Sequence, residues 1–191
     1  MRKTLRVASV LLACCAVFSG TALAQAIQGQ YVADFGLAFT QATVTKAQRG
    51  FLGADISMGK MLTNNLSVGL AIGYDVVSFQ KIDDIYQRLA VVPILARAKY
   101  YLTVAPLMQV HASAAGGVYR MVPHLGIDKL GGVWEAETKP GGSFGLGFDY
   151  WFLGRSGIGA EFEYNVMGAD SQDDNYFSYF AIRVSYSIVK M

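Results

Sequence analysis

His111 and Ser113 are the residues of this sequence that most suggest covalent chemistry. A serine nucleophile, a histidine base and a carboxylate form a hydrolase triad, and a spacing of two residues puts both side chains on one face of a β-strand. A glutamate from another strand would complete the set. The face in question is the enclosed one, however, so both side chains point away from any lipid substrate. We expect His111 and Ser113 to fill interior space, with hydrolysis as a remote alternative.

A second group of polar residues, Asp170, Asp173 and Asp174, lies next to Asn175 in a predicted loop. Carboxylate and amide oxygens are the ligands that divalent cations such as Ca²⁺ prefer, but this spacing is not that of an EF-hand loop. A solvated acidic loop is the simpler interpretation. We therefore expect no metal site, no catalytic site and no cofactor.

Ten ionisable residues fall on one face of the predicted strands. They are Asp34, Asp55, Asp75, Arg97, Lys99, His111, Asp149, Glu161, Glu163 and Arg183. If the strands close into a small barrel, this face lines an interior just wide enough for side chains, where charges must pair or form hydrogen bonds. Glu163 and Arg183 would lie at similar heights, within reach of Arg97 and Lys99. The pattern predicts a structural plug of ion pairs, with an electrostatic gate or narrow ion path as the alternative.

The elements that position these residues are predicted from a period-two alternation of apolar residues with small or polar ones. It is clearest near the C-terminus, where large apolar residues alternate with Ala181, Arg183, Ser185 and Ser187. Pro93 interrupts one strand, and because proline cannot donate to a ladder we expect a bulge there. The pattern predicts eight strands, at residues 30–41, 50–62, 66–78, 88–102, 106–119, 139–152, 157–168 and 176–189.

The predicted connections alternate in length. The short ones are residues 63–65, 103–105 and 153–156, and the longer ones are residues 42–49, 79–87, 120–138 and 169–175. Short periplasmic turns and longer extracellular loops are typical of barrels of the bacterial outer membrane. An even number of strands would put both termini in the periplasm.

The N-terminus has the three parts of a secretory leader: the basic residues Arg2, Lys3 and Arg6, a short apolar stretch, and small residues before Gln25. We expect Sec export with cleavage after Ala24, so that residues 1–24 are a signal peptide and residues 25–191 the barrel domain. The alternative is a lipoprotein box ending at Cys14.

Cleavage after Ala24 removes both cysteines, so disulfides would not stabilise the mature chain. It also removes three of the 16 basic side chains, leaving 13 against 14 acidic ones, a formal charge of −1. This charge gives no electrostatic footprint for nucleic acid.

The sequence is apolar without being helical. The mean hydropathy of the whole chain is +0.32, yet after the leader the longest apolar run, residues 89–96, is far short of the roughly 18 to 20 residues of a transmembrane helix. Apolar residues dispersed on lipid-facing strands explain both observations. The soluble alternative, a sandwich or lipocalin-like barrel with its apolar face inward, would leave a solvent face of glycine, alanine and serine, too weakly charged for that role.

With these features the chain resembles the small eight-stranded outer-membrane barrels, the family that includes the OmpA transmembrane domain and OmpX. The most specific match is residues 92–102, followed by a turn and the small-residue strand 112–119. The C-terminal strand resembles the segment that such proteins present to the barrel-assembly machinery, although it ends in Lys190-Met191 where the family usually has an aromatic residue. The resemblance implies an all-β, up-and-down antiparallel barrel in the outer membrane of a diderm bacterium.

The expected function is a non-enzymatic role in envelope integrity or surface interaction such as adhesion, by a monomer in contact with outer-membrane lipid and lipopolysaccharide. The alternative is a narrow, OmpW-like conduit for ions or small hydrophobic solutes. A remote one is lipid A deacylation, because lipid A deacylase barrels use His, Ser and Glu. The loop Arg120 to Thr138 is the candidate contact with a surface ligand. The extracellular loop candidates are His124, Asp128, Lys129, Trp134, Asp170, Asp173 and Asp174.

Overall fold

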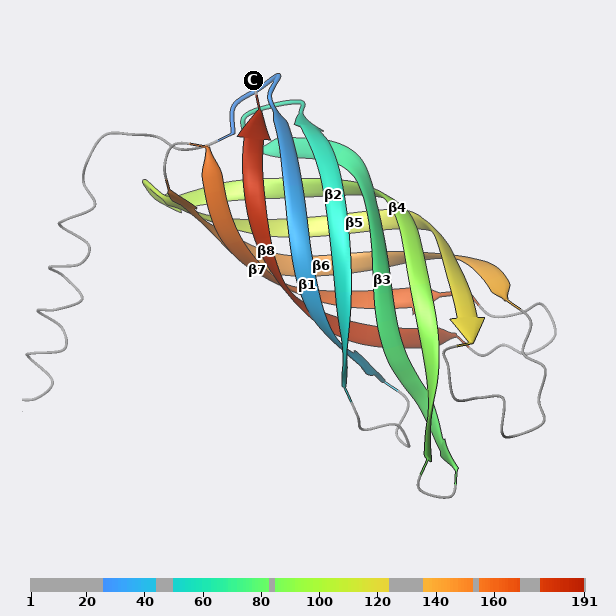
Figure 1. The fold of residues 1–191 in the computed structure, drawn as a ribbon. Coiled ribbons are helices and arrows are strands. Elements are labelled where there is room, and N and C mark those ends of the chain that lie inside the picture. The colour runs from blue at the N-terminus through green and yellow to red at the C-terminus, as the bar shows by residue number, and fades with distance from the viewer. Residues whose placement is uncertain are drawn as a thin grey trace, which may run out of the picture.

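A computed structural model of the chain (Figure 1) describes residues 26–43, 50–82, 85–123, 136–152, 155–168 and 176–190. The predicted leader and its cleavage site lie outside these residues. The strands are β1 (Tyr31–Ala42), β2 (Phe51–Met61), β3 (Leu66–Ile82), β4 (Ile85–Ala105), β5 (Met108–Pro123), β6 (Glu137–Phe152), β7 (Ser156–Met167) and β8 (Phe177–Lys190).

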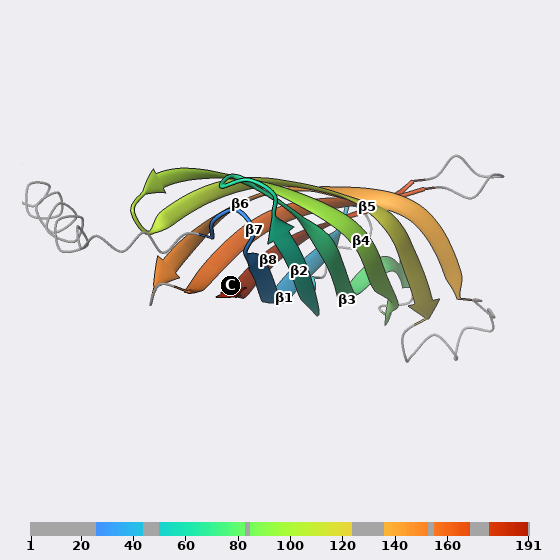
Figure 2. The same cartoon turned by 90° about the horizontal axis from the view of Figure 1, so that it is seen from above.

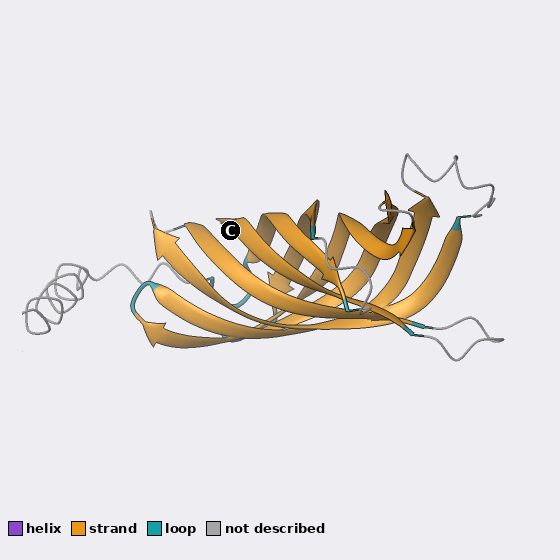
Figure 3. Cartoon of the chain, turned by 90° about the horizontal axis from the view of Figure 1, so that it is seen from below, coloured by secondary structure: helices purple, strands orange, loops and turns teal. Residues whose placement is uncertain are grey.

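Each strand pairs antiparallel with the next, and β1 pairs with β8, so the sheet closes into an up-and-down barrel. Figure 2 shows the strands running obliquely past one another, the tilt that closure of a small barrel requires. In Figure 3 the described residues form strands and short connections, without a helix. The predicted fold class, an eight-stranded antiparallel barrel, is confirmed.

Four strands, β3 to β6, are longer than the alternation predicted. Residues 79–87 were expected to form a loop, but β3 continues to Ile82 and β4 begins at Ile85. The pairing continues past a register shift between Ser78 and Gln80, because a paired ribbon satisfies backbone donors and acceptors that a loop would leave to water. The expected turn at residues 103–105 lies within β4, and β5 extends to Pro123, which shortens the connection to β6.

Pro93 does not form the expected bulge. The register of β3 and β4 passes from Ile72 opposite Ile94 to Asp75 opposite Val91 without a shift. The two intervening pairs, at the level of Pro93, are missing from the ladder. Gly73 makes room for the proline ring, since a Cβ on this glycine would lie 3.1 Å from Pro93 Cγ. The wall therefore accommodates the missing N–H donor by a local interruption of the β3–β4 ladder, with the proline ring packed against Gly73.

The outer wall of the barrel is apolar. Large side chains on several strands, among them Leu37, Leu52, Leu70, Phe144 and Leu146, are between 68% and 76% exposed. Charged and hydroxyl side chains of the same strands are buried on the inner face. A water-soluble barrel has the opposite distribution, whereas a barrel whose outer face contacts hydrocarbon has this one.

We also searched the described residues for an α-helix that could cross a membrane. None is long and apolar enough.

The short connections gather at one end of the barrel, which we call the turn end, together with the start of β1 and the end of β8 (Figure 1). Backbone hydrogen bonds join neighbouring hairpins there: Tyr101 N donates to Asn65 O at 2.7 Å and Trp151 N donates to Leu107 O at 2.8 Å. The opposite end, where β1, β3, β5 and β7 end and β2, β4, β6 and β8 begin, is the loop end. Both termini of the barrel thus lie on the side of the tight turns, as predicted.

The apolar wall predicts an asymmetric response to charge along β1. Replacing Leu37, in the middle of the outer face, with arginine should reduce the free energy of unfolding by about 2–4 kcal/mol, because the charge would face hydrocarbon. Gln41→Arg, on the same face near the loop end, should cost only about 0–1 kcal/mol. Denaturant titration of the protein folded in phospholipid vesicles measures both. Equal, negligible costs would contradict contact of this wall with lipid.

Candidate functional site

The candidate site is the lumen, whose side chains form three layers between the turn end and the loop end. The first layer, at the turn end, is mainly apolar and joins Ala26, Val32, Met61, Tyr101, Trp151 and Val189. Trp151 is buried, and its Nε1 donates to Gln109 Oε1 at 2.8 Å. This layer covers the turn end of the interior.

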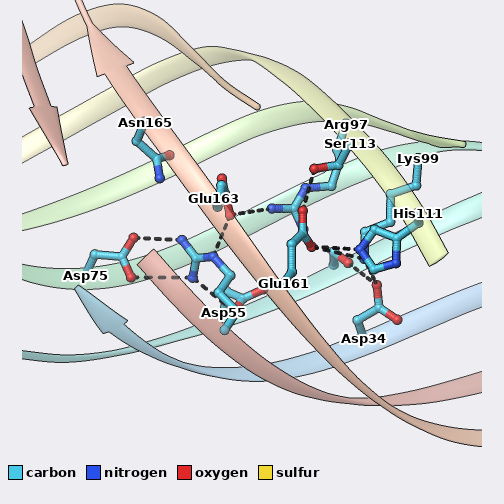
Figure 4. A network of polar contacts seen from close by, with 12 residues as sticks. Asp34, Asp55, Asp75, Arg97, Lys99, His111, Ser113, Glu161, Glu163 and Asn165 are labelled. Carbon is cyan, nitrogen blue, oxygen red and sulfur yellow. Dashed lines mark hydrogen bonds and ion pairs between the residues drawn. The ribbon is translucent and has the colours of Figure 1, made fainter. Parts of the chain in front are cut away.

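The middle layer is the lumen charge network, defined by the ten residues Asp34, Asp55, Asp75, Arg97, Lys99, His111, Asp149, Glu161, Glu163 and Arg183. Figure 4 labels all of them except Asp149 and Arg183. All ten point inward, and nearly all are less than a tenth exposed. Strict alternation along β1 to β8 places them there. The structure therefore brings together residues from all eight strands.

Arg183, on β8, is the hub of one half of this network. Its guanidinium donates to Glu163 Oε2 at 2.6 Å, to Asp75 Oδ2 at 2.9 Å and to Asp55 Oδ1 at 3.1 Å. Arg97 Nη2 donates to the same oxygen of Glu163, at 2.9 Å. Five strands are thus connected through two guanidinium groups.

The other half of the network lies nearer the turn end, around Lys99 and Glu161. Lys99 Nζ lies 3.0 Å from Asp34 Oδ2 and 3.6 Å from Glu161 Oε2. His111 Nδ1 donates to Asp149 Oδ2 at 2.8 Å, and His111 Nε2 lies 3.4 Å from Glu161 Oε2. The two halves meet on β7, where Glu161 and Glu163 face the lumen in succession.

Six carboxylates in the network exceed its three permanent cations, and hydroxyl groups supply further donors. Ser187 and Ser57 donate to Asp34 at 2.7 and 3.0 Å, and Tyr179 donates to Asp75 at 2.7 Å. These buried hydroxyls were not predicted as site residues. Like the charged residues, they occupy inward-facing positions of the alternating pattern, so the alternation could have identified them. They were missed because only charged residues were considered as site residues.

The third layer, toward the loop end, is apolar. It joins the buried residues Ala42, Val77, Leu89, Val91, Leu95, Tyr119, Met167, Tyr179 and Ala181. Tyr119 is fully buried and donates from its hydroxyl to Asn165 Oδ1 at 3.0 Å. The charge network is therefore enclosed between two apolar layers, where Coulomb interactions are strong and unpaired charge is costly.

The described part of the lumen contains a small cavity of about 20 Å³. Asp34, Ser57, Ser67, Lys99 and Tyr101 contribute to its lining. Such a volume holds about one water molecule. Most inward side chains of the described residues are buried in the three layers, as expected for eight strands.

Ser113 and His111 lie in the middle layer, but the serine–histidine hydrogen bond that a catalytic triad requires is not formed between them. Ser113 Oγ donates to Glu161 Oε1, and His111 is oriented by Asp149 and Glu161. In the described residues no hydrogen bond joins the serine to the histidine, and both side chains are buried. The arrangement satisfies Glu161 and does not activate Ser113 as a nucleophile.

The extracellular loop candidates cannot be placed in the same way. His124, Asp128, Lys129 and Trp134 lie outside the described residues, as do Asp170, Asp173 and Asp174. Among the described residues no group of three or more His, Cys, Asp or Glu side chains has a metal-binding arrangement.

Comparison with known proteins finds similarity in structure only. No family model matches the chain, and no curated protein matches it in sequence. Neisserial surface protein A superposes with a TM-score of 0.64 at 16% identity, over 84% of this chain and 99% of that one. OprG from Pseudomonas aeruginosa has a TM-score of 0.58 at 12% identity, over 88% and 99%.

Ail, the attachment invasion locus protein of Yersinia pestis, was solved in complex with the heparin analogue sucrose octasulfate. It has a TM-score of 0.51 at 14% identity, over 85% of this chain and all of that one. At these identities the similarity concerns the fold, and it agrees with the apolar outer wall and the filled polar lumen. The chain is therefore a closed eight-stranded β-barrel of the small outer-membrane type.

Proposed function

We propose that this protein is a closed outer-membrane barrel that acts in envelope integrity or surface interaction, and is neither an enzyme nor a water-filled pore. The observation that carries the proposal is the layered lumen, in which ion pairs are enclosed between two apolar layers. A lumen filled in this way leaves the outer wall and the loop end as the surfaces through which the protein acts.

We propose that the turn end lies in the periplasm and the loop end at the cell surface, because outer-membrane barrels have short periplasmic turns and longer extracellular loops. In this orientation the loop following Pro123 faces outward as the candidate contact with a surface ligand, in a background of lipopolysaccharide. The barrel-assembly machinery would insert the chain during biogenesis. Two proteins of similar fold, a neisserial surface protein and an attachment protein, support a surface role.

A second candidate function, lateral passage of small hydrophobic solutes, is favoured by one specific observation. The interruption of the β3–β4 ladder at Pro93 lies beside Val91 and Leu95 of the third layer, the apolar layer toward the loop end. On the outside of the wall, Ile94 is 49% exposed to the membrane. An apolar solute entering from the loop end would have to displace side chains of the third layer, and it would then leave through the wall where the β3–β4 ladder is interrupted, above the charge network.

The closed-barrel proposal predicts that the protein does not conduct ions. In planar bilayers at moderate voltage, the purified barrel should show no steps above the noise. The double variant Arg183→Ala/Glu163→Ala, which removes the centre of the plug, should show conducting events because water can then enter the lumen. Sustained channels in the unmodified protein would contradict the proposal and favour the ion-path alternative.

Loss of the Arg183 hub should also be strongly destabilising. Arg183→Met leaves Glu163, Asp75 and Asp55 without their shared cation, and breaking a buried ion pair costs about 3–5 kcal/mol. Denaturant titration in vesicles measures the loss. Arg120→Met, which removes an exposed cation on the outer face of β5, is the control and should change stability by less than about 0.5 kcal/mol. Similar effects of the two substitutions would mean that the network contributes little.

The lateral-passage candidate depends on Pro93 and is tested separately. Pro93→Ala restores an N–H donor, which should close the ladder and slow uptake of the apolar fluorophore N-phenyl-1-naphthylamine by cells that produce the protein. Pro140→Ala, at a proline of β6, is the matched control and should leave uptake unchanged. Uptake that is no faster than in cells lacking the protein would reject this second function.

A further inference from the structure

Two lysines and a tyrosine form a row across three neighbouring strands at the turn end. Tyr31, on β1, lies opposite Lys60 on β2 and opposite Lys190 on β8. All three side chains point outward and are exposed. The ring of Tyr31 therefore has a lysine on either side of it, at one height on the wall.

The row lies at the edge of the apolar wall. One outward position farther from the turn end, Ala33 is opposite Met58 and Ile188, which belong to the lipid-facing surface. Tyrosine is enriched where hydrocarbon meets headgroups, and lysine extends its ammonium toward that interface. Lys60, Tyr31 and Lys190 are therefore placed at headgroup level, with apolar side chains beside them for acyl chains.

The electrostatic surroundings favour an anion on this outer surface. Among the described residues, the side-chain carboxylates nearest to this end, Asp34, Asp149 and Glu161, point into the lumen and are bound there. Among the described residues, no salt bridge joins either lysine of the row to a carboxylate. The two ammonium groups therefore add their charge on the outside of the wall.

The geometry suits a single phosphate. Lys60 Nζ lies 5.8 Å from the centroid of the Tyr31 ring, so a cation–π contact holds this ammonium over the middle of the row. The backbones that carry the lysines are two strand spacings apart, roughly 10 Å. The length of a lysine side chain allows both ammonium groups to converge on one phosphodiester placed above the tyrosine.

We propose that Lys60, Tyr31 and Lys190 form a binding site for the headgroup of an anionic phospholipid in the periplasmic leaflet. The two lysines bind the phosphate, Tyr31 orients Lys60, and Met58 and Ile188 contact the upper acyl chain. A zwitterionic lipid binds less well, because its own ammonium or choline group competes with the lysines for the phosphate. The site depends on membrane insertion and is independent of whether the lumen conducts.

Native mass spectrometry of the detergent-folded barrel tests the site with two probes, dioleoylphosphatidylglycerol and dioleoylphosphatidylcholine. The unmodified protein should retain one phosphatidylglycerol with at least about fivefold tighter apparent affinity than phosphatidylcholine. In Lys60→Gln/Lys190→Gln this preference should fall to less than about twofold. Equal binding of the two lipids by the unmodified protein, or an unchanged preference in the double variant, would overturn the proposal.

The matched control is Arg120→Gln/Lys139→Gln, which removes the same charge near the loop end and should keep the preference. A mobility difference between boiled and unboiled samples on gels verifies that each variant is folded. Glycerophosphoglycerol, the soluble headgroup, tests the source of the phosphate. It should not displace the lipid at equal concentration, since the acyl contacts are part of the site, and displacement would instead identify a site for free phosphate esters.

Discussion

The structure depends most on the pairing of buried charge in a space that admits almost no water. Arg183 is bound by three carboxylates from β2, β3 and β7. Because β8 closes the barrel against β1, this guanidinium links the last strand to its neighbour β7 and also to β2 and β3, with which it is not paired. The apolar layers on either side raise the cost of any unpaired charge, so the network favours the closed barrel over open arrangements of the sheet.

The same constraint explains the composition of the inner face. Carboxylates outnumber permanent cations, and the shortage of donors is made up by Ser57, Ser187 and Tyr179. Small residues complete the fit: a Cβ on Gly36 would collide with the Asp55 carboxylate, and one on Gly147 would lie 2.6 Å from His111 Nε2. The glycines of the lumen therefore provide the space that the charged side chains occupy.

A barrel closed to ions needs a filled lumen, whereas lateral passage of a solute needs an opening in the wall. Pro93 lies where the wall and the lumen filling are next to each other. The ion-pair layer occupies the middle of the lumen, whereas the β3–β4 ladder is interrupted at Pro93, at the height of the third, apolar layer near the loop end. The two functions proposed above, a surface role and lateral passage, therefore depend on different parts of the barrel and can be tested separately.

Much of this protein follows from its sequence alone. Alternation from Tyr31 to Lys190 determined the number of strands, the face on which each charge lies and the exposure of the apolar face, because a strand has only two faces. It misjudged the ends of β3, β4 and β5, since the hairpin pairing that extends them depends on the partner strand. It also placed a bulge at Pro93, where Gly73 on the neighbouring strand lets the wall keep its register.

Only the tertiary structure decided which groups pair. The alternation along each strand placed Arg183 and Glu163 on the lumen face. The register of the eight strands and the tilt of the barrel decided that Arg183 also reaches Asp75 and Asp55. The same register turned Ser113 toward Glu161, away from the nucleophile role that its spacing from His111 suggested. Spacing along one strand specifies a face, whereas contacts across a lumen depend on the relative heights of strands that are distant in sequence.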